Sequence, residues 1–389
     1  MIERLIKFAL HERLITFCLM IGLCAAGYWC ISNMPTDSFP DVSNVQVQII
    51  TEPESLATEE VESLVTIPIE SVLNGLPKIS KIRSNSSFGL SVVTAVFDDD
   101  TDMYLARQLV QQRLNGLELP QDIPKPSLGP LVSSFSIVYM YYLESKKHDL
   151  IELRTIQDWL VAKRLLTVSG VGNVVSYGGF VKQYQVLVSP DKLKGYALTL
   201  DEVLNAISRN NMNAGGNFIE QSGEEIIIRG LGRINTEGDI NDIVLKAVGG
   251  TAVKISDVAS VSIGPAFRRG SASMNGNGEV VTGVIMTRKG ANSKEVIGKV
   301  KNTLDELSKL LPDGVKIVPY YNQVELVDRT AETVKEILGL SGALVIVILA
   351  AVLLDIPAAL IAAVIIPLSL LFSFILMKFT GLSANLMTL

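Results

Sequence analysis

Two long apolar segments enclose a body of mixed composition, and this arrangement constrains the fold more than any other feature. Leu14–Ile31 carries no charged residue and is about 18 residues long, close to the shortest helix that crosses a bilayer. Ile337–Met377 is too long for one crossing and is interrupted at Asp355–Ile356–Pro357, where proline removes a helix donor and restrains the preceding residue. The sequence therefore predicts three membrane helices, at 14–31, 337–354 and 358–377, with Pro357 in a tight turn between the last two and Pro367 kinking the third.

Basic residues before the first apolar segment indicate its orientation. Arg4, Lys7 and Arg13 precede it, and such charges favour the cytoplasmic side. We therefore expect the N-terminus in the cytoplasm and the body of the chain on the outer side of the membrane. A cleaved signal peptide is the alternative. It is disfavoured because the basic region is long, the apolar region exceeds the usual length and Cys24–Ala25–Ala26 is a mediocre cleavage site.

The composition fits a membrane protein with a large water-exposed part. Mean hydropathy is +0.36 and 48% of the residues are hydrophobic, yet 19% are charged. Only the segments inside the bilayer must be apolar, so both properties coexist in such a chain. The net charge is −6 and the pI is about 5.2, which gives no support to a nucleic-acid partner.

The residue types that carry chemistry are sparse. Cys18, Cys24 and Cys30 lie in the first apolar segment, and successive cysteines are turned by about 240°, so they predict helix packing rather than a metal cage. His11 and His148 are isolated and make no ligand set. The acidic run at 98–102 lacks the glycine and distal glutamate of a calcium loop and directly precedes a helix, which favours capping. With no nucleophile–base arrangement and no phosphate-binding glycine loop in the sequence, we expect neither an enzyme nor a cofactor.

The body begins with the pattern of a split β-α-β fold. Val45, Val47 and Ile49 alternate with polar residues, which is the period of a half-buried strand. The order β-α-β-β-α follows, and it is completed by a strand near Ser136–Leu143 or just before it, which predicts a ferredoxin-like unit. The other expected strands are 81–85 and 90–97. The apolar residues expected to face the sheet are Val61, Leu64, Val65 and Val72 in the first helix, distorted by Pro68, and Leu105, Leu109 and Leu114 in a second helix at 101–114.

A related order recurs, but an insertion interrupts it. The predicted elements are strands at 136–143, 171–177, 279–286 and 315–320, with helices at 150–166 and 295–311. In the first of these helices Leu153, Ile156, Trp159 and Leu160 are the expected apolar residues. The insertion, at about 181–265, has its own helix at 200–208, a Gly215–Gly216 turn and a strand at 225–229. The chain would thus hold two similar α/β units, the second split by an extra domain.

Several motifs in the right order resemble the resistance–nodulation–division efflux permeases, and most closely their heavy-metal efflux branch of the CusA/CzcA type. The resemblance extends from Met1 to Leu389 and covers a little over a third of a full-length member. The motifs are PTDSFPDVSNVQV at 35–47, FDDDTDMYLAR at 97–107, HDLIELRTIQDW at 148–159, KQYQV at 182–186, NAGG at 213–216, RRG at 268–270, MNGNGEV at 274–280 and GLSANLM at 381–387.

The resemblance implies a fold of membrane helices flanking two ferredoxin-like porter subdomains, the second interrupted by a docking domain. Implied partners are two further copies in a homotrimer, a periplasmic adaptor protein, an outer-membrane channel and the lipid bilayer of the bacterial inner membrane. Gly215 and Gly216 would lie in the reaching hairpin of the docking domain. The expected boundaries are 1–33 for the N-terminus and first span, 34–132 for the first porter subdomain, 133–180 and 269–332 for the two parts of the second, 181–268 for the docking domain, 333–379 for spans two and three, and 380–389 for the start of a fourth helix.

The stretch after the first span has a structural interpretation. Pro35 and Pro40 stiffen the exit from the bilayer, so that the first porter strand starts at a fixed angle. Asp37 and Asp41 belong to that wet, turn-forming junction, and a ligand role for them is disfavoured.

The resemblance also implies a proton-driven cation exporter. The chain departs from the family pattern in two ways, which concern the transported ion and whether the chain can pump on its own. None of the three predicted spans contains an ionisable residue, and the proton-relay aspartate of the family would lie beyond Leu389. We therefore expect this chain alone not to pump, and to be a truncated product or part of a longer gene product. Phe267 stands where a copper-type member has methionine, which weakens a copper or silver assignment. The alternatives are a permease for organic compounds and a membrane-tethered periplasmic scaffold without transport activity.

Overall fold

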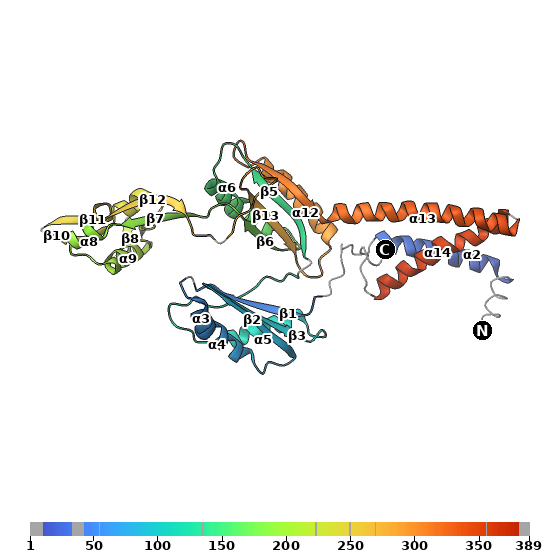
Figure 1. The fold of residues 1–389 in the computed structure, drawn as a ribbon, viewed down its shortest axis with the longest axis horizontal. Coiled ribbons are helices and arrows are strands. Elements are labelled where there is room, and N and C mark those ends of the chain that lie inside the picture. Colours follow the sequence, from blue (N-terminus) through green and yellow to red (C-terminus); the bar gives the residue numbers. More distant parts are fainter. Residues whose placement is uncertain are drawn as a thin grey trace.

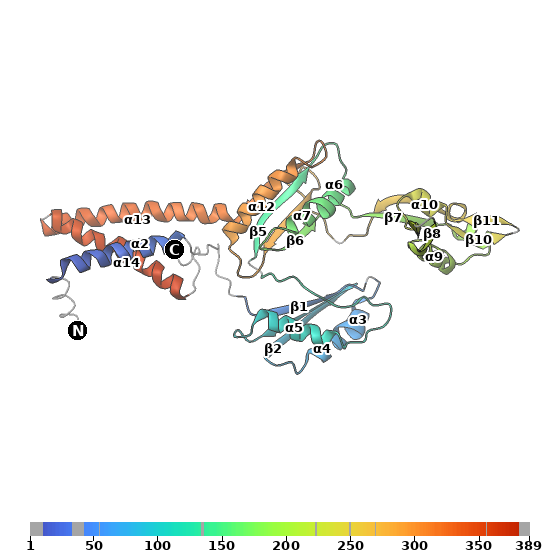
Figure 2. The ribbon, with the colours of Figure 1, turned by 180° about the vertical axis from the view of Figure 1, so that it is seen from behind.

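The computed structural model describes residues 11–32, 43–53, 55–133, 136–221, 224–248, 250–268, 270–354 and 356–380. The molecule is elongated, with a group of long helices at one end, two α/β units in the middle and a small inserted domain at the other end (Figure 1). The view from behind shows the same order, with the two α/β units lying side by side (Figure 2).

The first α/β unit is a four-stranded antiparallel sheet with a layer of helices. The strands lie in the order β2-β3-β1-β4, and β1 pairs with β3 from Gln46↔Val96 to Thr51↔Ser91. The alternation expected from the sequence places Val47 and Ile49 in the core. The elements are β1 (Gln46–Thr51), α3 (Thr58–Val61), the π-helical turn η1 (Glu62–Thr66), α4 (Ile67–Leu73), β2 (Ile79–Ser87), β3 (Leu90–Phe97), α5 (Met103–Leu114) and β4 (Ser127–Leu128).

Asp102 caps the N-terminus of α5, as the acidic run predicted. Its side chain accepts a hydrogen bond from the Leu105 amide at 2.9 Å, which satisfies one of the free donors of the first helical turn.

The second unit repeats this topology with the same strand positions. Its sheet has the order β14-β5-β13-β6, which corresponds to β4-β1-β3-β2 of the first unit. The strand expected near Ser136–Leu143 belongs to this second sheet as β5, and the first sheet is closed earlier by the short β4. The elements are β5 (Ile137–Glu144), α6 (Leu150–Ile156), the π-helical turn η2 (Gln157–Val161), α7 (Ala162–Leu166), β6 (Val171–Tyr177), β13 (Val281–Thr287), α12 (Ser293–Ser308) and β14 (Lys316–Asn322).

The inserted domain leaves the second unit between β6 and β13 and has a core of its own. Its first and last strands, β7 and β12, pair from Val188↔Ala259 to Lys182↔Pro265 and form a stem. The buried residues that pack together in this core are Leu198, Ile240, Ile243, Val253, Ile255, Val258 and Ala259. The elements are β7 (Lys182–Val188), α8 (Pro190–Gly195), α9 (Leu200–Arg209), β8 (Ala214–Gln221), β9 (Glu224–Gly230), α10 (Glu237–Asn241), β10 (Val244–Val248), β11 (Thr251–Lys254), α11 (Ile255–Val258) and β12 (Ala259–Pro265).

Among the described residues, three helices form the other end of the molecule: α2 (Arg13–Ser32), α13 (Gln323–Leu353) and α14 (Ile356–Thr380). α14 packs against both α2 and α13. α13 is longer than the predicted helix at 337–354, because it begins directly at the end of β14, where Asn322 caps it by accepting from the Val324 amide. Pro357 occupies the second position of α14 rather than the turn itself, a place where a missing amide costs no hydrogen bond. Pro367 lies inside α14, and the expected fourth helix at 380–389 lies outside the described residues except for Thr380.

In the part of the chain that the structure describes, no helix combines the length and the apolar character needed to cross a membrane. The three predicted spans therefore stay a prediction at this stage.

The covering helix of each unit contains a π-helical turn at the matching place. In the first unit the Thr66 hydroxyl lies 2.8 Å from the hydroxyls of both Ser86 and Ser91. In the second unit the buried Gln157 accepts from the Tyr141 hydroxyl at 3.0 Å and donates to Ser176 at 3.3 Å. Each turn thus ties its helix to two strands by a buried polar contact, and such contacts fix one helix register on the sheet.

The wider turns also explain two of the places where the expected helix faces are wrong. A π-helical turn adds a residue per turn, so positions after it no longer follow the α-helical period. Leu64, expected in the core, is 41% exposed, and Trp159 is 68% exposed. Val65, which was also expected in the core, is fully buried, and so is Val161, two residues after Trp159.

Replacing Tyr141 with phenylalanine should destabilise the second unit by about 1–3 kcal/mol, because the buried Gln157 Oε1 loses its donor. The check is the free energy of opening from hydrogen exchange of amides in β5, β6 and β13. Adding Gln157→Leu should recover part of this loss, since both polar partners are then removed. Tyr142→Phe, at the neighbouring half-exposed position, is the control and should change the value by less than about 0.5 kcal/mol. Equal effects of the two tyrosine changes would contradict the role of this contact.

Candidate functional site at the base of the inserted domain

Two segments connect the inserted domain to the second unit, and they run side by side. The outgoing segment is 178–181, between β6 and β7, and the return segment leaves β12 after Pro265. The amide of Ala266 donates to the carbonyl of Val181 at 2.8 Å, which continues the pairing of the stem. The base of the inserted domain is therefore a narrow double connection.

The outgoing segment needs glycine at its first two positions. Gly178 has a φ of +72° and Gly179 a φ of +65°, in the left-handed region that side chains rarely adopt. A Cβ atom on Gly178 would lie 2.1 Å from the carbonyl oxygen of Val280, and one on Gly179 would lie 2.6 Å from Val281 Cγ2. The absence of side chains here lets the backbone of the outgoing segment pass against the start of β13.

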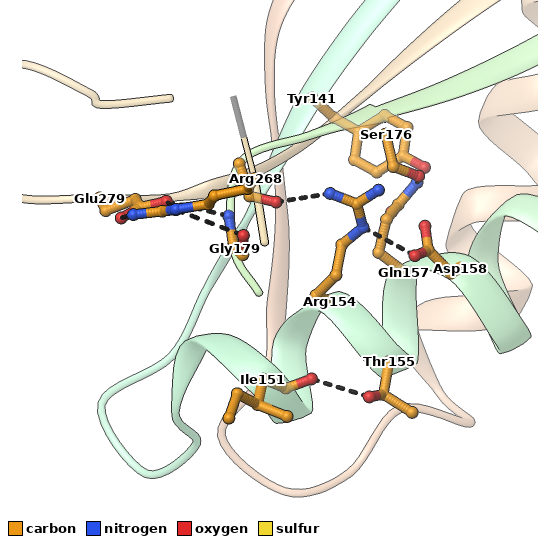
Figure 3. Close-up of polar contacts among 11 residues, drawn as sticks. Tyr141, Ile151, Arg154, Thr155, Gln157, Asp158, Ser176, Gly179, Arg268 and Glu279 are labelled. Atoms are coloured by element: carbon orange, nitrogen blue, oxygen red, sulfur yellow. Dashed lines mark hydrogen bonds and ion pairs between the residues drawn. The ribbon is translucent and has the colours of Figure 1, made fainter. Parts of the chain in front are cut away.

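Arg268 and Glu279 close the return segment onto the outgoing one. The guanidinium makes a two-pronged contact with the carboxylate, with Nη2 donating to Oε2 at 2.9 Å and Nη1 bonded to Oε1 (Figure 3). Arg268 Nη1 also donates to the carbonyl of Gly179 at 3.3 Å, and the amide of Gly179 donates to Glu279 at 3.1 Å. The guanidinium carbon lies 3.9 Å from the centroid of the Phe180 ring.

Each residue of this pair stabilises the ionised form of the other. The hydrogen bond from Arg268 holds the pKa of the Glu279 carboxyl below its ordinary value, and Glu279 in turn raises the pKa of Arg268. Both groups are therefore ionised at neutral pH, and the pair is a charge-assisted, bidentate contact.

A second arginine anchors the outgoing segment to the covering helix. Arg154 of α6 donates from Nη1 to the carbonyl of Gly178 at 2.7 Å and from Nε to Asp158 at 2.7 Å (Figure 3). Asp158 lies in the π-helical turn η2. We call the four side chains Arg154, Asp158, Arg268 and Glu279 the basal clamp.

A cleft of about 630 Å³ opens beside the basal clamp, between the β5–α6 connection and the 274–280 loop. Its volume is in the range of small-molecule sites. His148 on its rim is engaged locally, since Nδ1 lies 2.8 Å from Glu152 and Nε2 lies 3.3 Å from the carbonyl oxygen of Asp313. Among the described residues, no group of three or more histidine, cysteine or acidic side chains is placed to hold a metal ion.

The inserted domain carries an exposed apolar hairpin, formed by β8 and β9. Its exposed apolar residues are Phe218, Ile219, Ile226 and Ile227. An exposed apolar patch of this kind is typical of an interaction surface. Gly215 and Gly216 lie within β8 rather than in the expected turn, next to an irregularity of the register between Gly215 and Phe218, which is a common place for glycine in a strand.

All four residues of the basal clamp lie in motifs quoted from the sequence, but none of them was assigned a role in a site. Pro35, Asp37, Pro40 and Asp41 lie outside the described residues. Arg154 and Asp158 belong to the HDLIELRTIQDW motif, and Arg268 and Glu279 belong to RRG and MNGNGEV. No helical or strand period connects these motifs, so local pattern does not predict that they meet.

Comparison with known proteins places the whole chain in one family. The AcrB/AcrD/AcrF family profile matches residues 5–389. The chain is 40% identical to the cation efflux system protein CzcA of an Alcaligenes strain and 40% identical to the cation efflux system protein CusA of Escherichia coli K12, in both cases over 100% of this chain. It covers 37% and 38% of the length of these relatives.

Solved structures agree with the sequence comparison. Two crystal forms of a heavy metal efflux pump superpose with TM-scores of 0.88 and 0.89, at 35% and 36% sequence identity, over 98% of this chain and 39% and 38% of the pump chain. The mixed α/β porter architecture is therefore shared with that pump. The chain belongs to the AcrB/AcrD/AcrF family, as its motifs predicted, and the members of this family are efflux transporters, not enzymes.

Proposed function

We propose that the chain is the N-terminal part of an inner-membrane permease that exports heavy-metal cations in exchange for protons. The observation that carries this proposal is the similarity over the whole chain to proteins named for cation efflux and for cobalt-zinc-cadmium resistance. The likeness to two crystal forms of a heavy metal efflux pump, at TM-scores of 0.88 and 0.89, supports it as well.

In this proposal α2, α13 from Ile337 onward and α14 sit in the lipid, and the two α/β units and the inserted domain lie in the periplasm. The charge-free segment 14–31 and the apolar segment 337–377 support this placement. Trp29 and Lys378 do so as well: the Lys378 ammonium lies 5.9 Å from the Trp29 ring centroid, near the ends of α2 and α14. Tryptophan and lysine are both favoured at the membrane surface, so these two helix ends would share one interface.

The domain boundaries expected from the sequence become part of the proposal. Residues 34–132 would form the first porter subdomain, 133–180 with 269–332 the second, and 181–268 the docking domain. Its exposed β8–β9 hairpin would contact a neighbouring copy in a homotrimer, and the periplasmic part would meet an adaptor protein and an outer-membrane channel. The apolar exposure of the hairpin supports an assembly role.

Metal tolerance tests the substrate. The complete reading frame that contains this chain is expressed in a bacterium lacking its own metal exporters, and growth is measured with zinc, cobalt, nickel, cadmium, copper and silver. We expect higher tolerance to at least one of these ions and no change with organic toxins. The same plasmid with a stop codon near the start of the reading frame is the control. Tolerance gained for organic compounds alone would favour the organic-compound permease, and no gain for any compound would favour the scaffold.

Labelling of single cysteines tests the placement in the membrane. In a chain without Cys18, Cys24 and Cys30, an impermeant maleimide should label Asp201→Cys, at an exposed position of α9, in cells with a permeable outer membrane. Lys7→Cys should react only after the inner membrane is opened, because it would face the cytoplasm. The intact mass of the protein should include residues 14–31. Loss of these residues from the mature protein would show a cleaved signal peptide and refute the anchor.

A charge on the hairpin tests assembly. Ile227 is 79% exposed, so Ile227→Asp should leave the fold of a single chain intact. If the hairpin is buried against a neighbouring copy, the same change should shift the complete protein from trimer to monomer on native gels, since it places a charge in an apolar contact. Leu310→Asp, at a position that is 71% exposed in the second unit, is the matched control. A trimer fraction unchanged by Ile227→Asp would remove the hairpin from the interface.

A further inference from the structure

The inserted domain occupies the place of a tight hairpin turn. In the first unit, β2 and β3 are neighbours and are joined by the two residues Phe88 and Gly89. The matching strands of the second unit, β6 and β13, are also neighbours and pair from Thr282↔Tyr177 onward, but residues 178–280 lie between them. A short turn fixes the register and direction of its strands, whereas two separate connecting segments leave the attached domain free to swing.

A short turn would fix the geometry of the connection between β6 and β13, and the basal clamp fixes it in place of that turn. Arg268 on the return segment bonds both to the carbonyl of Gly179 on the outgoing segment and to Glu279, which lies two residues before β13. Glu279 completes the loop by accepting from the Gly179 amide. Contacts therefore link the outgoing segment, the return segment and the start of β13 to one another.

The helix layer provides a second, separate anchor. Arg154 holds the carbonyl of Gly178, and Asp158 holds Arg154 in place from η2. The two glycines, whose backbone would otherwise be the most mobile part of the connection, are thus fixed from α6 on one side and from Arg268 and Glu279 on the other.

The type of contact decides whether such a clamp can be rigid. Isolated exposed ion pairs contribute little, because water and side-chain entropy oppose them. The Arg268–Glu279 pair differs, since it is bidentate, part of a network, and covered by Phe180 on one face. Its side chains are 31% and 19% exposed, against 43% and 74% for the Lys254–Asp242 pair inside the inserted domain.

We propose that the basal clamp locks the inserted domain to the second α/β unit, so that the two turn as one rigid body instead of swinging about their double connection. The proposal rests on the geometry of the clamp and is independent of the transported substance. One consequence rests on the proposed function: in a permease, any rotation of the second unit during transport would be carried directly into the inserted domain and its exposed hairpin.

Distance measurements between spin labels test the lock. Labels are placed on the full chain at Asp201→Cys in α9 and Lys301→Cys in α12, both exposed, after replacement of Cys18, Cys24 and Cys30 by alanine. Double electron–electron resonance should give a narrow distance distribution. Arg268→Met should widen it about twofold or more, because both charge-assisted bonds are lost, and Arg268→Lys should widen it less, since one bond can remain. Arg154→Met should also widen it.

The matched control is Lys254→Met, which removes an ion pair and a charge from the inserted domain but leaves its base intact. It should keep the narrow distribution. Hydrogen exchange of β6, β13 and β12 in each variant shows that the units remain folded, and Arg268→Lys provides a folded variant if Arg268→Met is unstable. The proposal is overturned if the parent distribution is already broad, if Arg268→Met and Arg268→Lys both leave it narrow, or if Lys254→Met widens it equally. No transport is measured, so a negative metal-tolerance result leaves this test unaffected.

Discussion

The structure depends on one constraint: a folded domain must leave a sheet between two neighbouring strands and return without separating them. Entropy alone disfavours closing a long connection, by about 0.6 kcal/mol for each doubling of its length. The stem of β7 and β12 reduces this cost, because it brings the two ends of the insertion together at Lys182 and Pro265. What remains is a short double connection, and here the glycine pair and the basal clamp determine the direction in which the domain projects.

The two α/β units show what the sequence can and cannot predict. The alternation in β1 and the β-α-β-β-α order are visible because a half-buried sheet imposes a period of two on every strand. The place of the insertion is visible because the second set of strands and helices is split by a segment of different pattern. The closing strand of the first sheet, β4, has only two residues, which is too short for any periodicity, and so the sequence could not separate it from β5.

Two of the failures in the helices have a common physical origin. A third, Leu105, is exposed in α5, which contains no π-helical turn. Leu64 and Trp159 were placed on the buried face by an α-helical period, but each follows the start of a π-helical turn that shifts the period. The basal clamp was missed for a related reason. Arg268 and Glu279 are joined by an irregular loop, closed by the Ser273↔Glu279 bridge and two positive-φ glycines, and no local period connects them. In both cases tertiary contacts, rather than local pattern, select the conformation.

The second unit is the mechanical link between the two ends of the molecule. At one side of its sheet, β14 passes into α13 without a loop, since Asn322 is both the last residue of the strand and the cap of the helix. At the other side, β13 and β6 carry the basal clamp and the inserted domain. β5 pairs with both β14 and β13, so the path from helix to clamp consists of directly hydrogen-bonded strands. Because a packed sheet deforms little, a displacement of α13 along its axis would be applied at β14 and reach the inserted domain through the rigid sheet rather than through a flexible linker.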